Sequence, residues 1–189
     1  MKNKKITDDK TGHLGGHLNI THIDVGALRH IKNKFNIKSM IDIGCGPGGQ
    51  ILVAKNIGIE NAIGIDGFPG NHREKGVKII LHDFTVSKYD HNKNKYDLAW
   101  SCEFVEHVEE RFIPNYLNSF RVCKYVAMTF APEGKAGYHH VNCKDQKYWL
   151  DVMEEHGFLL DEATTEEMRK KSTMKNNFIR EHGLFFKSD

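Results

Sequence analysis

The pattern of apolar and polar positions predicts short strands that alternate with helices along most of the chain. Apolar runs of strand length occupy 39–43, 62–65, 77–83, 95–102, 125–130 and 158–160. Apolar residues recur at helical spacing over 22–35, 50–56, 103–121 and 145–156, with a break expected at Pro114 and a stop at Gly157. Residues 176–188 resemble a final strand that is interrupted at Gly183.

This alternation predicts an α/β fold, a three-layer sandwich around a mostly parallel seven-stranded sheet. Ligands are then expected at the carboxyl ends of the strands. With 189 residues, the chain fits one domain spanning 1–189. Residues 1–20 are expected to form a tail, or a lid built around His13 and His17 and the glycines between them.

Composition narrows the function classes. The chain is 39% hydrophobic and 28% charged, and it contains no apolar run of the roughly 18 residues that a membrane span requires. The N-terminal MKNKKITDDK has no apolar segment behind its lysines, so a cytoplasmic location is expected. A net charge of +2 does not indicate a nucleic-acid binder, although a local basic patch can hide in a balanced total. The four cysteines form no CxxC pair and are expected to be reduced thiols.

The stretch IDIGCGPGG, residues 41–49, places four glycines between a predicted strand and a predicted helix. Such a loop lets backbone N–H groups approach a ligand closely, and the helix N-terminus behind it favours negative charge. Gly44, Gly46 and Gly49 satisfy the GxGxxG spacing of dinucleotide sites, and Asp66 lies where a ribose-binding acid is expected. On these residues alone, a nicotinamide or flavin cofactor remains an alternative.

Asp42 separates the alternatives, because it lies in the strand two residues before Gly44. A carboxylate there would repel a pyrophosphate, but it can attract the cationic amino-acid end of S-adenosyl-L-methionine. The spacing Asp42, Gly44, Gly46, Gly48 resembles the D/E-x-G-x-G-x-G motif of class I S-adenosylmethionine-dependent methyltransferases. Three further motifs, IGIDG, LHDF and YDLAWSCEFVEHV, follow in that family's order.

The resemblance implies a set of cofactor contacts. Asp66 would hold both ribose hydroxyls, and Asp83 would accept a hydrogen bond from the adenine amino group, with Phe84 beside it. Phe68 is a candidate for stacking on the adenine. The full set of expected cofactor residues is Asp42, Gly44, Cys45, Gly46, Gly48, Asp66, Gly67, Phe68, Asp83, Phe84, Ser101 and Glu103.

A polar cluster follows the fourth strand. Glu103, Glu106 and His107 are spaced i, i+3 and i+4, so on a helix they would share one face, while His139 and His140 lie in the loop after the fifth strand. Glu103, Glu106, His107 and His140 could hold a divalent metal ion, which lowers the pKa of a bound hydroxyl. ExxEH with a later His is similar to the pattern of small-RNA 2′-O-methyltransferases, and ExxEH alone to that of ubiquinone-pathway O-methyltransferases, both of which use a metal.

The sequence favours a metal-free site over a metal ion, with His107, His139 or His140 as a general base that deprotonates a hydroxyl. Trp100 and Tyr138 are candidates for the wall of an acceptor pocket. The sequence therefore favours a methyltransferase acting on a small-molecule hydroxyl, such as that of a sugar or metabolite. A metal-dependent RNA 2′-O-methyltransferase and a non-catalytic cofactor-binding protein are the alternatives.

Overall fold

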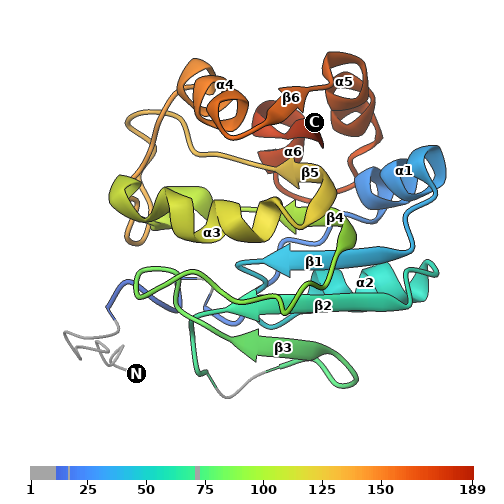
Figure 1. Ribbon diagram of the computed structural model, residues 1–189, viewed down its shortest axis with the longest axis horizontal. Coiled ribbons are helices and arrows are strands. Elements are labelled where there is room, and N and C mark those ends of the chain that lie inside the picture. The colour runs from blue at the N-terminus through green and yellow to red at the C-terminus, as the bar shows by residue number, and fades with distance from the viewer. Residues whose placement is uncertain (1–11, 17, 71–72) are drawn as a thin grey trace.

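The computed structural model of the protein describes residues 12–16, 18–70 and 73–189 and contains one seven-stranded sheet between two layers of helices (Figure 1). The strand order is β3-β2-β1-β4-β5-β7-β6, in which β7 runs antiparallel to both of its neighbours and the other pairs are parallel. The strands are β1 Ser39–Ile43, β2 Asn61–Asp66, β3 Lys78–Leu81, β4 Tyr96–Ser101, β5 Cys123–Met128, β6 Phe158–Leu160 and β7 Leu184–Ser188. The predicted fold class is confirmed.

Two hydrophobic clusters cover the two faces of the sheet. On one face α3 and α4 pack with Ile41, Ile43 and Val126, and on the other α1, α2, α5 and α6 pack with Met40, Leu98 and other strand residues. In the central strands, neighbouring residues such as Met40 and Ile41 enter opposite clusters, because successive side chains of a strand point to opposite faces. The helices are α1 Val25–Phe35, α2 Gly49–Asn56, α3 Ile113–Phe120, α4 Gln146–Glu155, α5 Glu162–Lys171 and α6 Phe178–His182.

Side-chain caps set where several helices begin. The Asp24 carboxylate accepts a hydrogen bond from the Ala27 amide, so α1 begins at Val25 rather than at residue 22. Asp145 caps α4 in the same way through the Tyr148 amide. Gly157, directly after the C-terminal end of α4, has φ of +80°, as its expected role at the end of that helix requires.

The prediction of one helix over 103–121 with a break at Pro114 is wrong. Glu103 has a left-handed φ of +53°, and only two short 3₁₀ helices follow, η1 Val105–His107 and η2 Glu110–Phe112. Pro114 lies in the first turn of α3, where its missing N–H costs no helical hydrogen bond. Proline therefore starts this helix instead of breaking it.

The prediction of a single interrupted strand over 176–188 is also wrong. Residues 178–182 form α6, and the Gly183 amide bonds to the Ile179 carbonyl before β7 begins. Helix α5 was not predicted, because it buries Thr164, Thr165 and Met168 and so shows little apolar periodicity.

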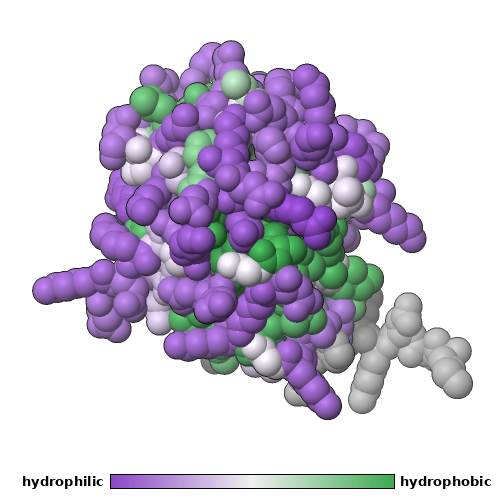
Figure 2. Space-filling model, turned by 90° about the vertical axis from the view of Figure 1, so that its right-hand side faces the viewer, coloured by the Kyte–Doolittle hydropathy of each residue, from purple (hydrophilic) through white to green (hydrophobic). Residues whose placement is uncertain are grey.

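Figure 2 shows the face that lies at the right of Figure 1, where the parallel strands have their amino ends. This face is mainly hydrophilic, with a group of hydrophobic residues near its centre. Within the part of the chain that the structure describes, no helix combines the length and the apolar character needed to cross a membrane.

Candidate active site

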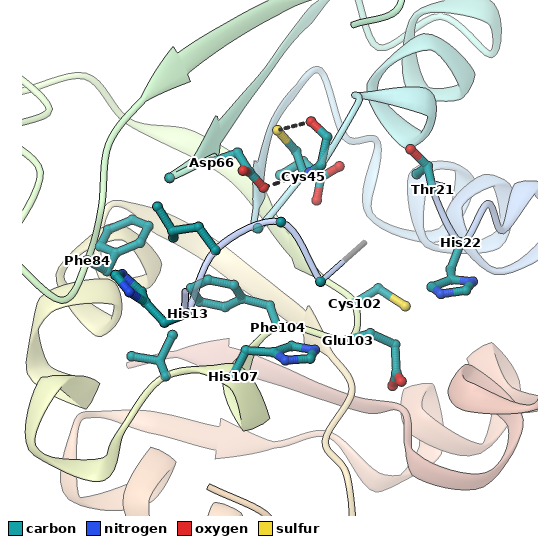
Figure 3. Close-up of a pocket in the computed structure, with 18 of the residues that line it drawn as sticks. His13, Thr21, His22, Cys45, Asp66, Phe84, Cys102, Glu103, Phe104 and His107 are labelled. Atoms are coloured by element: carbon teal, nitrogen blue, oxygen red, sulfur yellow. Dashed lines mark hydrogen bonds between the residues drawn. The ribbon is translucent and has the colours of Figure 1, made fainter. Parts of the chain in front are cut away.

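A cavity of about 250 Å³ lies at the carboxyl ends of the parallel strands (Figure 3). Most of the residues predicted for the cofactor or for catalysis line it: Asp42, Gly44, Cys45, Gly46, Asp66, Gly67, Asp83, Phe84, Glu103, His107 and His140. The structure thus gathers residues from a span of about 100 positions around one space. Their roles in binding and chemistry stay predictions.

The glycine loop has the backbone geometry that only glycine adopts readily. Gly44 and Gly48 have φ of +74° and +93°, and the Gly44 amide donates to the Ile65 carbonyl of β2. A Cβ on Gly44 would lie 2.3 Å from the Phe104 ring. Gly48 begins α2 as its N-cap residue and does not line the cavity.

Asp66 and Asp42 form the acidic side of the loop. One Asp66 oxygen accepts from the Gly46 amide and the other from the Phe68 amide, each at 2.8 Å. Asp42 is 3% exposed, and burial together with the nearby charge of Asp66 raises its pKa well above the usual range. A cationic ligand group would lower the cost of ionising Asp42, which fits the amino-acid end of S-adenosylmethionine.

Asp83 lines the same cavity beside Phe84, and its Cα would lie 3.4 Å from a Cβ on Gly67, the residue after Asp66. Its Oδ1 accepts hydrogen bonds from the Thr85 amide and the Thr85 hydroxyl, both at 2.8 Å, and His13 Nε2 lies 2.9 Å from Oδ2. Burial acts to raise the pKa of Asp83, but the hydrogen bonds from Thr85 and His13 outweigh it and lower that pKa. Asp83 is therefore an ionised acceptor at neutral pH.

Glu106, His107 and His140 form a cluster at the edge of the cavity. One ligand atom from each lies within 4.8 Å of the others, and the rings of the two histidines are 4.9 Å apart. Glu106 is fully buried, and among the described residues neither of its carboxylate oxygens has a hydrogen-bond partner; the same is true of His107 Nδ1. Buried polar atoms without partners are uncommon, and a cation would supply the missing partner.

The protonation states in this cluster suit a metal ion. Burial, followed by the proximity of His140, lowers the pKa of His107 to about 4, so its imidazole is neutral at pH 7. Burial and the nearby Glu103 raise the pKa of Glu106 well above its usual range. Imidazoles and a carboxylate are a common ligand set for divalent transition metals, and a bound cation would favour the ionised form of Glu106.

The structure does not bring Glu103 into this cluster. The helical spacing expected for residues 103–107 fails because Glu103 precedes η1 with a left-handed backbone, and its side chain accepts from the Thr129 hydroxyl instead. Burial raises the pKa of Glu103 to about 7. His139 also lies outside the cluster, and its ring faces that of His13 at 6.0 Å.

Ser101 and Phe68 have positions different from those expected of direct cofactor ligands. Ser101 is buried and its hydroxyl donates to the Ile43 carbonyl, which joins β4 to β1. The Phe68 ring packs on Gly15, where a Cβ would meet ring carbon Cε2 at 2.8 Å. Neither residue lines the cavity.

The N-terminal residues 12–16 and 18–22, here called the roof segment, form part of the cavity lining and bond to two other segments. Seven of them line it: His13, Leu14, Gly15, Gly16, Ile20, Thr21 and His22. The Tyr138 hydroxyl donates to the Gly12 carbonyl at 2.5 Å, and the Gly49 amide donates to the Thr21 hydroxyl at 3.1 Å. His17, named above with His13, lies outside the described residues.

Sequence reasoning missed several other lining residues, among them Gln50, Thr85, Cys102 and Phe104. Thr85 had a readable signal, since a Thr two residues after an Asp often bonds back to that carboxylate. Gln50 had none, because its partner is the backbone of Asp24, 26 residues earlier. Trp100 and Tyr138, proposed for an acceptor pocket, both line the cavity.

Residues 41–126 match the family model of a methyltransferase domain. This part of the chain is a methyltransferase domain, and its motifs are those of the class I S-adenosylmethionine-dependent methyltransferases. The matched range contains the glycine loop, Asp66, Asp83 and the Glu106–His107 pair, so the resemblance drawn from the motifs and the cofactor assignment are confirmed. The same result decides against a dehydrogenase.

Solved structures share the fold of this methyltransferase. A TehB-like S-adenosylmethionine-dependent methyltransferase from Corynebacterium glutamicum matches at 18% identity over 87% of this chain and 88% of its own, with a TM-score of 0.61. Magnesium protoporphyrin IX methyltransferase from Synechocystis, solved with bound cofactor, matches at 12% identity over 98% of this chain and 84% of its own, with a TM-score of 0.55. The methyltransferase domain of a bacterial Hen1 matches at 18% identity over 72% of this chain and 84% of its own, with a TM-score of 0.55. The methyltransferase matches no curated protein sequence.

Proposed function

We propose that this methyltransferase transfers the methyl group to a hydroxyl of a small molecule, such as a sugar or another metabolite, and that Glu106, His107 and His140 hold a divalent metal ion for this reaction. The observation that supports the proposal best is the buried Glu106 carboxylate. Its two oxygens have no hydrogen-bond partner among the described residues, and nitrogen atoms of two histidines lie within 4.8 Å of it. A hydroxyl is the acceptor that gains most from such a centre, because its own pKa is far above neutral.

Bound S-adenosylmethionine supplies a methyl group on a sulfonium, so its leaving group needs no proton. A bound divalent ion supplies a positive charge that stabilises the alkoxide form of an acceptor hydroxyl. The protein must then orient the acceptor, and orientation of two reactants can contribute on the order of 7–11 kcal/mol.

The chain's own residues divide this work. Asp42, Asp66 and Asp83 bind the cofactor at three points of the cavity, and the aromatic Phe104 and Tyr138 restrict the space beside it. His107, with its low pKa, is a weak base but a good neutral ligand. Glu103 has a pKa near neutral and lines the same cavity, which suits it better than His107 for accepting a proton.

The 2′-hydroxyl of RNA is the second candidate acceptor. The same cluster supports it, since Glu106, His107 and His140, three of the four residues in the pattern similar to small-RNA 2′-O-methyltransferases, lie close together. The net charge of +2 gives no support to a long nucleic-acid footprint.

Methyl transfer from isotopically labelled S-adenosylmethionine tests the proposal. The protein is incubated with Mn²⁺ or with EDTA, and with sugars, phenols, amines, RNA and the matching 2′-deoxy oligonucleotide. The proposal predicts an O-methylated small molecule, formed with Mn²⁺ and lost with EDTA and in Glu106→Gln. Label in RNA but not in the 2′-deoxy oligonucleotide would favour the second candidate, and label only on amines would contradict both.

A further inference from the structure

The contact between His13 and Asp83 joins residues 70 positions apart. Asp83 is the acid that the family resemblance assigns to the adenine amino group, whereas His13 belongs to the roof segment and to no family motif. The two side chains are 21% and 22% exposed, so the contact is largely shielded from water. His13 lies beside Phe84 in Figure 3, at the same end of the cavity.

The hydrogen-bond donors around Asp83 leave one direction open. A carboxylate offers about four acceptor directions, two on each oxygen. The Thr85 amide and hydroxyl fill both directions on Oδ1, and His13 Nε2 fills one on Oδ2. An ionised carboxylate cannot donate, so His13 Nε2 must be the donor. One acceptor direction on Oδ2 remains.

We propose that His13 is a specificity-determining residue of the cofactor site. It holds the Asp83 carboxylate in an orientation in which the remaining lone-pair direction of Oδ2 can accept a hydrogen bond only from a base that carries an amino group. A 6-oxo purine would present a carbonyl oxygen to this carboxylate, and two acceptors repel each other. His13 is a positioning residue in this account, because it acts on the base through Asp83.

The roof segment is built to carry His13 to this place. Its far end is fixed by Thr21, which accepts from the Gly49 amide, and by the buried pair of hydrogen bonds between Gln50 and the Asp24 backbone. Near its start the Tyr138 hydroxyl donates to the Gly12 carbonyl. His13 therefore lies between two attachment points.

Close packing in the roof segment also requires its glycines. A Cβ on Gly15 would lie 2.8 Å from the Phe68 ring, and one on Gly16 would lie 2.8 Å from the Tyr138 ring. The Leu14 side chain reaches Gly67, where a Cβ would meet it at 2.7 Å. The segment is thus fitted to the residues that surround the cofactor site.

The test compares S-adenosylhomocysteine with S-inosylhomocysteine, which carries an oxo group in place of the adenine amino group. Calorimetry gives both Kd values for wild type, His13→Ala, His13→Gln and Tyr138→Phe. Wild type should bind the adenosyl compound at least about 100-fold more tightly. His13→Ala should lower this ratio about tenfold, as expected for loss of a hydrogen bond to a charged group. His13→Gln keeps an N–H donor and should restore most of the ratio.

Tyr138→Phe is the matched control, because it removes a different hydrogen bond of the roof segment, the one to the Gly12 carbonyl, without touching Asp83. It should raise the Kd of both compounds by the same factor, so that the ratio of the two Kd values stays within about twofold of the wild-type ratio. If His13→Ala weakened the binding of both compounds by the same factor, or changed the Kd of neither, the proposal would be overturned, since His13 would then only cover the site. Failure of wild type to bind either compound would overturn it together with the cofactor assignment. Unchanged circular dichroism confirms that each variant folds.

Discussion

The Asp66 carboxylate accepts a hydrogen bond from the backbone amide of Gly46 across 2.8 Å, which joins the end of β2 to the glycine loop after β1. Its other oxygen accepts from the Phe68 amide. Each oxygen keeps one further acceptor direction, which is enough for the two ribose hydroxyls that the family resemblance assigns to this residue. Asp66 can thus shape the loop and bind the ligand at once.

Asp66→Ala should therefore lower the affinity for S-adenosylhomocysteine by at least about 100-fold, because hydrogen bonds to a charged group contribute about 1.5–3 kcal/mol each. Calorimetric titration measures this. Asp90→Asn is the control, since the Asp90 carboxylate accepts from the Asn92 amide in an exposed turn, and the affinity of this variant should equal that of wild type. Retained binding in Asp66→Ala would show that the ribose is held elsewhere.

Tyr138→Phe should speed the release of S-adenosylhomocysteine. The variant loses one hydrogen bond to the Gly12 carbonyl, worth about 0.5–1.5 kcal/mol, so the dissociation rate should rise roughly 2- to 10-fold. Stopped-flow fluorescence measures the rate. Tyr148→Phe is the control, because the Tyr148 hydroxyl bonds to the exposed Glu110, and its rate should not change. Equal rates in all three proteins would mean that the roof segment does not restrain the ligand.

Glu103 should make the protein less stable as the pH rises. Burial raises its folded pKa to about 7, above the value of about 4.5 expected when unfolded, so the folded state binds the proton more tightly. The stability that this proton gives is present below pH 4.5 and is lost as the pH rises to about 7. The loss at pH 8 should amount to a few kcal/mol.

Glu103→Gln removes this titration. In urea unfolding, the stability of the variant relative to wild type should increase between pH 5 and pH 8. Comparison of the two proteins isolates Glu103 from Glu106, which also titrates. A difference between the two proteins that stays constant from pH 5 to pH 8 would contradict the raised pKa.

Most of the fold and the cofactor side of the site could be predicted from sequence, because both depend on local signals. Apolar runs predicted the seven strands, although the first half of the last one is a helix. The spacing from Asp42 to Gly46 and on to Asp83 predicted residues that line one cavity. Local signals failed for α5, whose buried face includes two threonines, and for Glu103, whose backbone is left-handed in spite of helical spacing.

Long-range contacts explain the rest. No pattern near His13 shows that it meets Asp83, and none near Tyr138 shows that it meets Gly12, since these contacts depend on how distant segments cross the cavity. Glu103 and Glu106 also look equivalent in the sequence but have different surroundings in the structure. The Glu103 carboxylate accepts from the Thr129 hydroxyl, whereas the Glu106 carboxylate has no hydrogen-bond partner among the described residues. The two glutamates are distinguished by the surroundings of their side chains in the folded protein, which their spacing in the sequence does not reveal.

The proposed metal site is the central claim, and calorimetric titration of Mn²⁺ into the protein saturated with S-adenosylhomocysteine tests it most directly. Wild type should bind one ion per chain, and the double variant Glu106→Gln/His140→Ala should bind none while still binding S-adenosylhomocysteine. Glu109→Gln, a change at a partly exposed residue paired with Arg111, should bind Mn²⁺ as wild type does. Wild type without any heat of Mn²⁺ binding, or a double variant that binds as tightly as wild type, would contradict the account.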